Sequence, residues 1–297
     1  MGRLVGKIIM STRKQWEILF CLIVSLMMIF IFANSPSPAA CQNQEGCRQL
    51  AVTARQPLPT EMVSSFEKAG TNKLGSAAPP LPQIYKGYPT YTKIPGIVPC
   101  DLLKAVAYVE SGWKQFNAVF GQVGPTLISF DCGFGAMQIT TGMRISDPMP
   151  NWDPARVASE VEYNIGTGAL FLVSKWNAVP NFIGDNNPFI IEDWYYALWA
   201  YNGFSYVNNP NNQKYPADRT PFNGTQPRSQ YPYQELVYGY LANPPKYNNI
   251  PYWNAISATL PDRKLIGEIP PRWIPRPAPY HFSCGLDFSN FLPVIFR

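Results

Sequence analysis

The sequence predicts a mainly α-helical domain with a small β-hairpin, an α+β fold, behind an N-terminal membrane segment. Three observations support this prediction. Four segments between residues 101 and 243 carry apolar side chains at helical spacing. Short strand-like runs occur in the turn-rich segment 113–152 that separates the first two of them. Residues 18–33 form one apolar run without a polar face.

The N-terminal segment, residues 1–34, has the pattern of a signal-anchor. Four basic residues precede the apolar run, namely Arg3, Lys7, Arg13 and Lys14. Because such positive charges stay in the cytosol, we expect a single-pass membrane protein whose remaining chain is extracytoplasmic. The run of 16 residues is slightly short for a span, but Trp16 and the residues after Ala33 can extend it. Cleavage after Ala33 would give a secreted protein instead, and Cys41 follows only a poor lipoprotein signal.

The next part, residues 35–90, is rich in Pro, Ser, Ala, Gln and Gly and shows little periodicity. This composition predicts a linker that holds the domain away from the membrane. Residues 261–297 are rich in proline and predict an extension that runs over the surface as extended chain. The folded domain is therefore expected at residues 91–260.

Within that domain, four helices and one hairpin are expected in order. The first helix begins near Asp101, a good N-cap, and ends near Gly112. The second begins at Asp153-Pro154, a cap followed by a first-turn proline, and continues to residue 176. The third and fourth cover residues 191–202 and 233–243. The runs LISF (127–130) and MQIT (137–140) predict the small hairpin.

Composition and charge exclude several classes of function. Apolar residues make up 46% of the 297 residues, which is enough for a sizeable core. The net charge is +5 and the sequence contains no basic stripe, so we expect no nucleic-acid partner. No cluster has zinc-ligand spacing and no phosphate-binding glycine loop follows a strand, so we expect neither metal nor cofactor. Exposed Trp and Tyr rings would suit the faces of sugars, although core packing should claim most of them.

Histidine and cysteine give little sign of nucleophilic catalysis. The single histidine, His281, lies in the proline-rich extension, where a Ser-His-Asp or Cys-His site is not expected. An exported domain permits disulfides. Cys41 and Cys47 are close enough in sequence to form a local pair, but five cysteines outside the apolar run leave one over, so the connectivity stays open.

Glu110 is the first candidate for catalysis. On the first predicted helix it shares a face with Leu103, Val106 and Ala107, so it continues an apolar stripe. It also lies in the last turn, where the helix dipole disfavours a negative charge. Both effects raise a carboxyl pKa, and a carboxylic acid that is protonated near neutrality can donate a proton to a glycosidic oxygen. Many glutamates near helix ends are merely solvated, and the spacing alone does not exclude this reading.

Three further motifs follow Glu110-Ser111-Gly112-Trp113 in order. They are GFGAMQI at 133–139, Asn164-Ile165 with Gly168 and Leu172, and Ala200-Tyr201-Asn202-Gly203. This order resembles the soluble lytic transglycosylase family, whose fold is similar to goose-type lysozyme. The resemblance covers residues from about 96 to 243, roughly half of the chain.

The resemblance implies a lysozyme-like domain that cleaves MurNAc-β-1,4-GlcNAc bonds in the glycan strands of peptidoglycan. Glu110 would be the catalytic acid and base, and a 1,6-anhydro-MurNAc end would form. Ser111, Met137 and Gln138 would line the sugar groove. Tyr201 would hydrogen-bond close to Glu110, and Asn202 would help to hold this wall of the sugar groove.

The sequence departs from the family pattern in two places. Glu110 and Gln138 are 28 positions apart, more than in most members, and Tyr201-Asn202 runs directly into Gly203. The extra stretch, residues 120–131, suggests an enlarged loop beside the cleft and ends in Asp131.

Asp131 leaves two alternatives open. As a second carboxylate it would activate water and make the protein a hydrolytic muramidase resembling goose-type lysozyme. Otherwise it caps a turn. Such lysozymes tend to carry Asp where this chain has Thr140. A further alternative, from another class of protein, is a non-catalytic glycan-binding component of the cell envelope, which would have no use for an acid on an apolar stripe.

Overall fold

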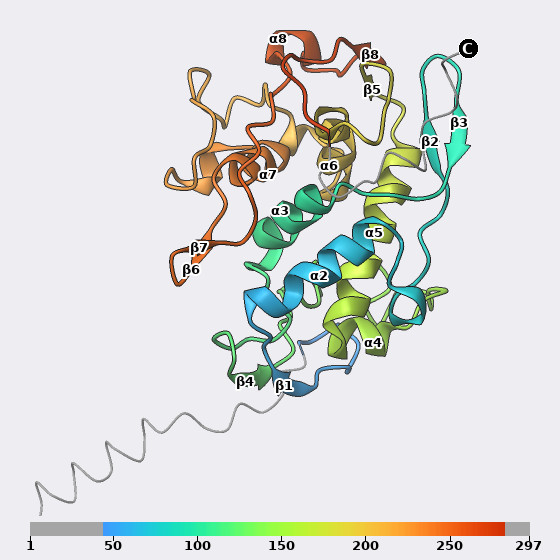
Figure 1. The fold of residues 1–297 in the computed structure, drawn as a ribbon, viewed down its shortest axis with the longest axis vertical. Coiled ribbons are helices and arrows are strands. Elements are labelled where there is room, and N and C mark those ends of the chain that lie inside the picture. Colours follow the sequence, from blue (N-terminus) through green and yellow to red (C-terminus); the bar gives the residue numbers. More distant parts are fainter. Residues whose placement is uncertain (1–43, 283–297) are drawn as a thin grey trace, which may run out of the picture. The chain divides into compact units, whose positions relative to one another are not determined.

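The computed structural model describes residues 44–282, which form an α+β fold of α-helices and two-stranded sheets (Figure 1). The described residues belong to one compact unit. Within them, no helix combines the length and the hydrophobicity needed to cross a bilayer. The predicted membrane segment at residues 18–33 lies outside the described range.

Helix α3 (Cys100–Ser111) lies at the centre of the helical core. It packs between α2 (Pro59–Gly70) and α7 (Tyr233–Ala242), and α2 in turn packs on α5 (Val161–Ala178). Most α3 side chains are buried, including the polar Asp101 and Lys104, which form an ion pair of 3.2 Å. A helix that is covered on nearly all sides holds its last turn in a fixed position.

The first helix matches its predicted extent within one residue. It begins at Cys100, with Pro99 as the N-cap, so Asp101 lies in the first turn instead of capping the helix. It ends where predicted, because Gly112 adopts the left-handed conformation (φ 65°) that terminates helices.

The predicted second helix is divided into two. Asp153 caps α4 (Pro154–Ser159) as expected, with its Oδ1 accepting a 2.9 Å bond from the Ala155 amide. At Glu160 the backbone becomes extended and α5 begins. The third predicted helix is also divided, into the 3₁₀ helix η2 (Ile191–Trp194) and α6 (Tyr195–Tyr201). The fourth predicted helix corresponds to α7.

The linker predicted at residues 35–90 is wrong for residues 44–90, which are part of the fold. Helix α2 begins at a first-turn proline, Pro59, and buries Met62 and Phe66 in the core. The 3₁₀ helix η1 (Gly75–Ala77) follows. The many small residues and prolines of this segment have the composition of a linker, so the amphipathic helix α2, which is only 12 residues long, was not predicted.

The small sheets also differ from the prediction. Residues 127–140 form single bridges, Ile128 to Phe134 and Phe134 to Ile139, instead of two regular strands. Left-handed backbone at Gly135 (φ 67°) and Gln138 (φ 49°) interrupts the extended conformation. Antiparallel pairs form elsewhere, between β1 (Thr53–Arg55) and β4 (Val123–Pro125), β2 (Ile84–Lys86) and β3 (Thr92–Ile94), and β6 (Lys246–Tyr247) and β7 (Ile250–Pro251).

A disulfide joins Cys47 to Cys132, which decides the connectivity that the sequence left open and excludes the local Cys41–Cys47 pair. A backbone bridge between Cys47 and Arg144 brings the N-terminal end of the described chain to this segment. The bond therefore attaches residue 47 to the end of the extra stretch. Cys100 is buried in α3.

The C-terminal extension is attached to the domain over residues 261–282. After α8 (Arg263–Ile266), strand β8 (Trp273–Ile274) pairs in parallel with β5 (Phe182–Ile183). His281 Nδ1 lies 2.8 Å from Glu192 Oε1, and this contact attaches the extension to η2. The extended conformation was predicted, and the short helix was not.

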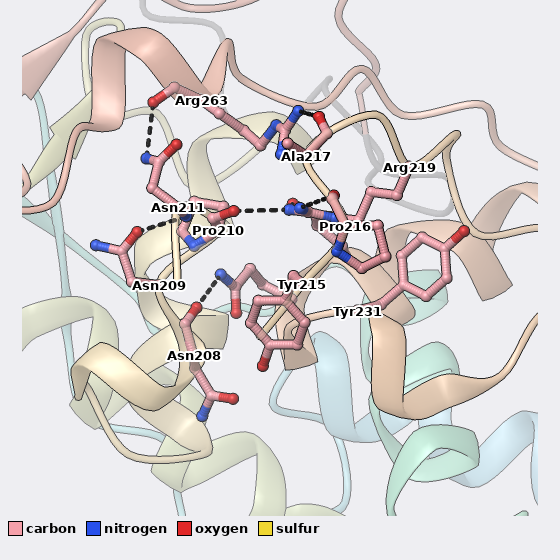
Figure 2. A network of polar contacts seen from close by, with 12 residues as sticks. Asn208, Asn209, Pro210, Asn211, Tyr215, Pro216, Ala217, Arg219, Tyr231 and Arg263 are labelled. Carbon is pink, nitrogen blue, oxygen red and sulfur yellow. Dashed lines mark hydrogen bonds and ion pairs between the residues drawn. The ribbon is translucent and has the colours of Figure 1, made fainter. Parts of the chain in front are cut away.

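The long connection between α6 and α7, residues 202–232, is held by a polar network (Figure 2). It contains the 3₁₀ helices η3 (Tyr206–Asn208) and η4 (Arg228–Gln230). Arg219 donates to Pro210 O (3.0 Å) and forms a buried 2.5 Å ion pair with Glu235 of α7. Asn211 donates to Arg263 O (2.9 Å), which connects the segment to α8. These bonds hold residues 202–232 in one conformation, although the segment contains no long helix or strand.

Candidate active site

Glu110 lies in the last turn of α3 with a partly exposed side chain. Tyr233, the first residue of α7, donates a 2.6 Å hydrogen bond from its hydroxyl to Glu110 Oε1. Because α3 and α7 pack directly against each other, this contact is set by the helical core. The acid is therefore held at a fixed orientation at the edge of the core.

The pKa of Glu110 is raised from 4.5 to about 7. Burial is the largest cause, because it disfavours the charged form. The Tyr233 hydrogen bond and the positive charge of Arg228 act in the opposite direction, and the negative charge of Asp131 acts with burial. Burial also keeps the pKa of Tyr233 well above its usual value, so the phenol stays a donor. Glu110 can therefore exchange a proton near neutral pH in either direction.

Ser111 connects the end of α3 to the glycine turn. Its hydroxyl donates to Ala136 O (2.7 Å) and accepts from the Lys114 amide (3.1 Å). The motif around Glu110 and the motif at 133–139, which lie more than 20 residues apart in the sequence, are thus neighbours in space. Ser111 therefore links the end of α3 to the glycine turn, and its hydroxyl is already hydrogen-bonded to protein groups.

Two buried amides hold the glycine turn in place. Asn164 accepts from the Met137 amide (2.8 Å) and donates to Phe134 O (2.7 Å). Gln115 Oε1 accepts from the Ala136 amide (3.1 Å). A Cβ on Gly135 would lie 2.2 Å from Gln115 Oε1, and the residue has a positive φ, so both space and conformation require glycine there.

Met137 does not line a groove, which corrects the expectation from the resemblance. Its side chain is fully buried and lies against Gly168, where a Cβ would come within 2.5 Å of the methionine methyl group. Its main-chain carbonyl instead accepts a 2.9 Å hydrogen bond from the Tyr201 hydroxyl. Met137 therefore sets the distance between the turn and α5.

Tyr201 lies close enough to Glu110 for the two side chains to interact electrostatically, but its hydroxyl bonds to Met137 O and not to the carboxyl. Its ring stacks on that of Tyr233 with centroids 6.4 Å apart, and the charge of Glu110 contributes to its raised pKa. Gln138 is partly exposed, and its amide donates to Gly135 O (2.8 Å). Asn202 is exposed and accepts from Asn208, without a described contact to Glu110 or to the turn.

Asp131 is partly exposed and close enough for its charge to affect Glu110. Its Oδ1 accepts a 2.5 Å bond from the Ser129 hydroxyl, and that hydroxyl also accepts from the Gly133 amide (2.8 Å). Ser129 therefore caps the turn, and Asp131 accepts a hydrogen bond from the Ser129 hydroxyl. One carboxylate oxygen of Asp131 remains available to other groups.

Two cavities in the described part of the molecule lie away from Glu110. One, of about 560 Å³, is formed at the opposite end of α3 and includes Lys68, Lys104 and Trp253. The other, of about 310 Å³, adjoins the glycine turn and includes Thr140, Arg144 and Asp147. We place the candidate site at Glu110, because a carboxyl whose pKa lies near neutrality has the chemistry that proton transfer requires.

Sequence reasoning missed Tyr233 and Arg228. Tyr233 is one of 17 tyrosines and lies 123 positions after its partner, so only its place at the start of a predicted helix marked it. Arg228 lies in a connection without periodicity, and its guanidinium donates a 2.6 Å bond to Val109 O, the carbonyl next to Glu110. No sequence pattern joins either residue to the first helix.

Within residues 44–282, no group of three or more His, Cys, Asp and Glu side chains could hold a metal ion. Comparisons with protein-family models, curated proteins and solved structures found no match to this chain.

Proposed function

We propose that this protein is a membrane-anchored, extracytoplasmic lytic transglycosylase that cleaves MurNAc-β-1,4-GlcNAc bonds in peptidoglycan glycan strands. The observation that carries the proposal is the Glu110 carboxyl, with a pKa of about 7 and a phenol fixed against it. The order of the four motifs, which resembles that of the soluble lytic transglycosylases and their lysozyme-like fold, supports the same reading. The proposed anchor is the apolar run at residues 18–33.

In the proposed reaction, protonated Glu110 donates its proton to the leaving glycosidic oxygen as the bond to the anomeric carbon breaks. The resulting carboxylate then takes the proton of the 6-hydroxyl of the same MurNAc. That oxygen closes on the anomeric carbon and gives the 1,6-anhydro ring. The second step is intramolecular, which favours it over attack by water. Tyr233 stabilises the carboxylate between the two steps.

A second candidate is a hydrolytic muramidase with Asp131 as the base. The influence of the Asp131 charge on Glu110 favours this candidate. The Ser129 hydrogen bond occupies Oδ1 and leaves only the other carboxylate oxygen to take a proton from water, which weakens this candidate. A non-catalytic glycan-binding role would require neither a raised pKa at Glu110 nor its phenol partner.

The test is the rate at which purified protein clears a suspension of peptidoglycan. Glu110→Gln should keep the fold and abolish clearing, because the amide has a similar size but cannot donate the proton. The matched control is Glu67→Gln, a largely exposed glutamate in the last turn of α2. Clearing by Glu110→Gln at the wild-type rate would exclude Glu110 as the acid, and no clearing by the wild type would favour the binding role.

A further inference from the structure

Arg228 lies beside the candidate acid with most of its hydrogen-bond donors unused. A guanidinium carries five N–H donors. Among the residues that the structure describes, Arg228 uses one of them, in the 2.6 Å bond from Nη2 to Val109 O. Its side chain is exposed, and Val109 directly precedes Glu110. A cation with four remaining donors is thus held within one residue of the acid.

The position of Arg228 is set by the segment that carries it. The buried Arg219–Glu235 ion pair (2.5 Å) fixes this segment to α7 on the N-terminal side of η4. On the other side, Tyr231 is buried and its hydroxyl donates to Thr220 O (2.9 Å). A guanidinium that is already positioned loses less conformational entropy when it binds a ligand.

The other side chains near Glu110 that can donate hydrogen bonds already donate to protein groups. The Tyr233 hydroxyl is bonded to Glu110, that of Tyr201 to Met137 O, and that of Ser111 to Ala136 O. The Gln138 amide is bonded to Gly135 O. Arg228 is therefore the side chain in this group with charge and donors to offer, and the planar fork of arginine matches a carboxylate.

Resting on the function proposed above, we propose that Arg228 binds the free lactyl carboxylate of the MurNAc residue whose glycosidic bond is cleaved. The lactyl group is on the same sugar ring as the anomeric carbon whose bond to the leaving oxygen is broken in the proposed reaction. In a strand that carries stem peptides, this carboxyl is an uncharged amide. The nearest stem carboxylate is then at least one amino acid further away, a distance of about 3.5 Å in extended chain.

The substrate class that follows is a glycan strand without its stem peptides. Such a strand is the product of an amidase reaction, in which water cleaves the amide between the lactyl group and the first amino acid. That reaction leaves the carboxylate on the sugar and an amine on the released peptide. An enzyme of that class must therefore act before this one.

The experiment compares the full-length protein on two substrates, peptide-free glycan strands from amidase treatment and the same strands with their peptides. The wild type should have the higher kcat/KM on peptide-free strands. Arg228→Gln should lower that value about tenfold or more, since a hydrogen bond to a charged group is lost. Its effect on peptide-bearing strands should be much smaller, and Arg228→Lys should be intermediate on peptide-free strands. Arg272→Gln, which changes an exposed arginine before β8, is the control.

Equal losses on both substrates would overturn the inference, because they would mean that Arg228 only supports the end of α3 or the pKa of Glu110. A wild-type preference for peptide-bearing strands would also overturn it. Binding of a peptide-free MurNAc–GlcNAc oligosaccharide to Glu110→Gln, with and without Arg228→Gln, decides the inference independently of cleavage. Weaker binding by the double variant supports it, and equal binding contradicts it. Failure of the wild type to cleave either substrate would count against the proposed function.

Discussion

At the scale of single residues, the behaviour of Glu110 depends on opposing effects. Burial raises its pKa, and the Tyr233 hydrogen bond and the Arg228 charge lower it. The resulting value of about 7 is suited to a group that must first give a proton and then take one. The apolar stripe predicted the direction of this shift, but the counteracting groups are distant in sequence and were not predicted.

Tyr233→Phe should raise the pKa of Glu110 further, because the hydroxyl stabilises the charged carboxylate more than the protonated acid. The basic limb of the kcat/KM profile against pH should therefore move to higher pH. Tyr196→Phe is a matched control, since the Tyr196 hydroxyl is buried without a partner among the described residues. A basic limb that stays in place in Tyr233→Phe would mean that this hydrogen bond does not tune the acid.

Glu110→Gln should also change how stability depends on pH. The folded-state pKa of about 7 lies above the usual 4.5, so the folded protein binds the extra proton between these values. Wild-type stability should therefore fall as the pH rises from 4.5 to 7, by on the order of 2 kcal/mol. The variant lacks this loss and should be the more stable protein at pH 8, while the two converge near pH 4.5. Chemical denaturation at both pH values measures the difference, and parallel curves for the two proteins would contradict it.

At the scale of elements, periodicity located the helices but not their interruptions. The extents of α3 and α7 were predicted closely, because each has apolar residues at helical spacing and clear ends. The break at Glu160 was not predicted, since nothing in the local sequence distinguishes it from continuous helix. Helix α2 was missed because its surroundings have the composition of a linker. The conformation of the 133–138 turn depends on Asn164 and Gln115, which are far away in sequence.

Gly135→Ala should destabilise the protein. It should also reduce activity, because Ser111, the residue after Glu110, is hydrogen-bonded to the turn at Ala136 O. The new methyl group would meet Gln115 and Asn164 inside a buried network. The control is Gly203→Ala, which also has a positive φ but has open space around its Cβ position. We expect Gly203→Ala to cost about 1 kcal/mol and Gly135→Ala about 2–3 kcal/mol more. Equal unfolding free energies for the two variants would refute the role assigned to the turn.

At the scale of the whole molecule, the candidate site joins the end of α3, the glycine turn, α6 and the start of α7. Sequence reasoning identified Glu110, Ser111 and Tyr201 of this group from motif order. It assigned Met137 to the groove wrongly, because burial of a methionine is decided by packing across α5. The disulfide connectivity stayed open at the level of the sequence for the same kind of reason, since Cys132 lies 85 residues from its partner Cys47.

The central claim is that Glu110 cleaves a glycosidic bond with ring closure and without a second carboxylate. Mass spectrometry of the products from purified peptidoglycan tests it most directly, because an anhydro end is lighter than a hydrolysed end by one water. The account predicts 1,6-anhydro-MurNAc ends from the wild type and from Asp131→Asn at similar rates, and no products from Glu110→Gln. Hydrated ends from the wild type, together with loss of activity in Asp131→Asn, would contradict it and identify a hydrolytic muramidase.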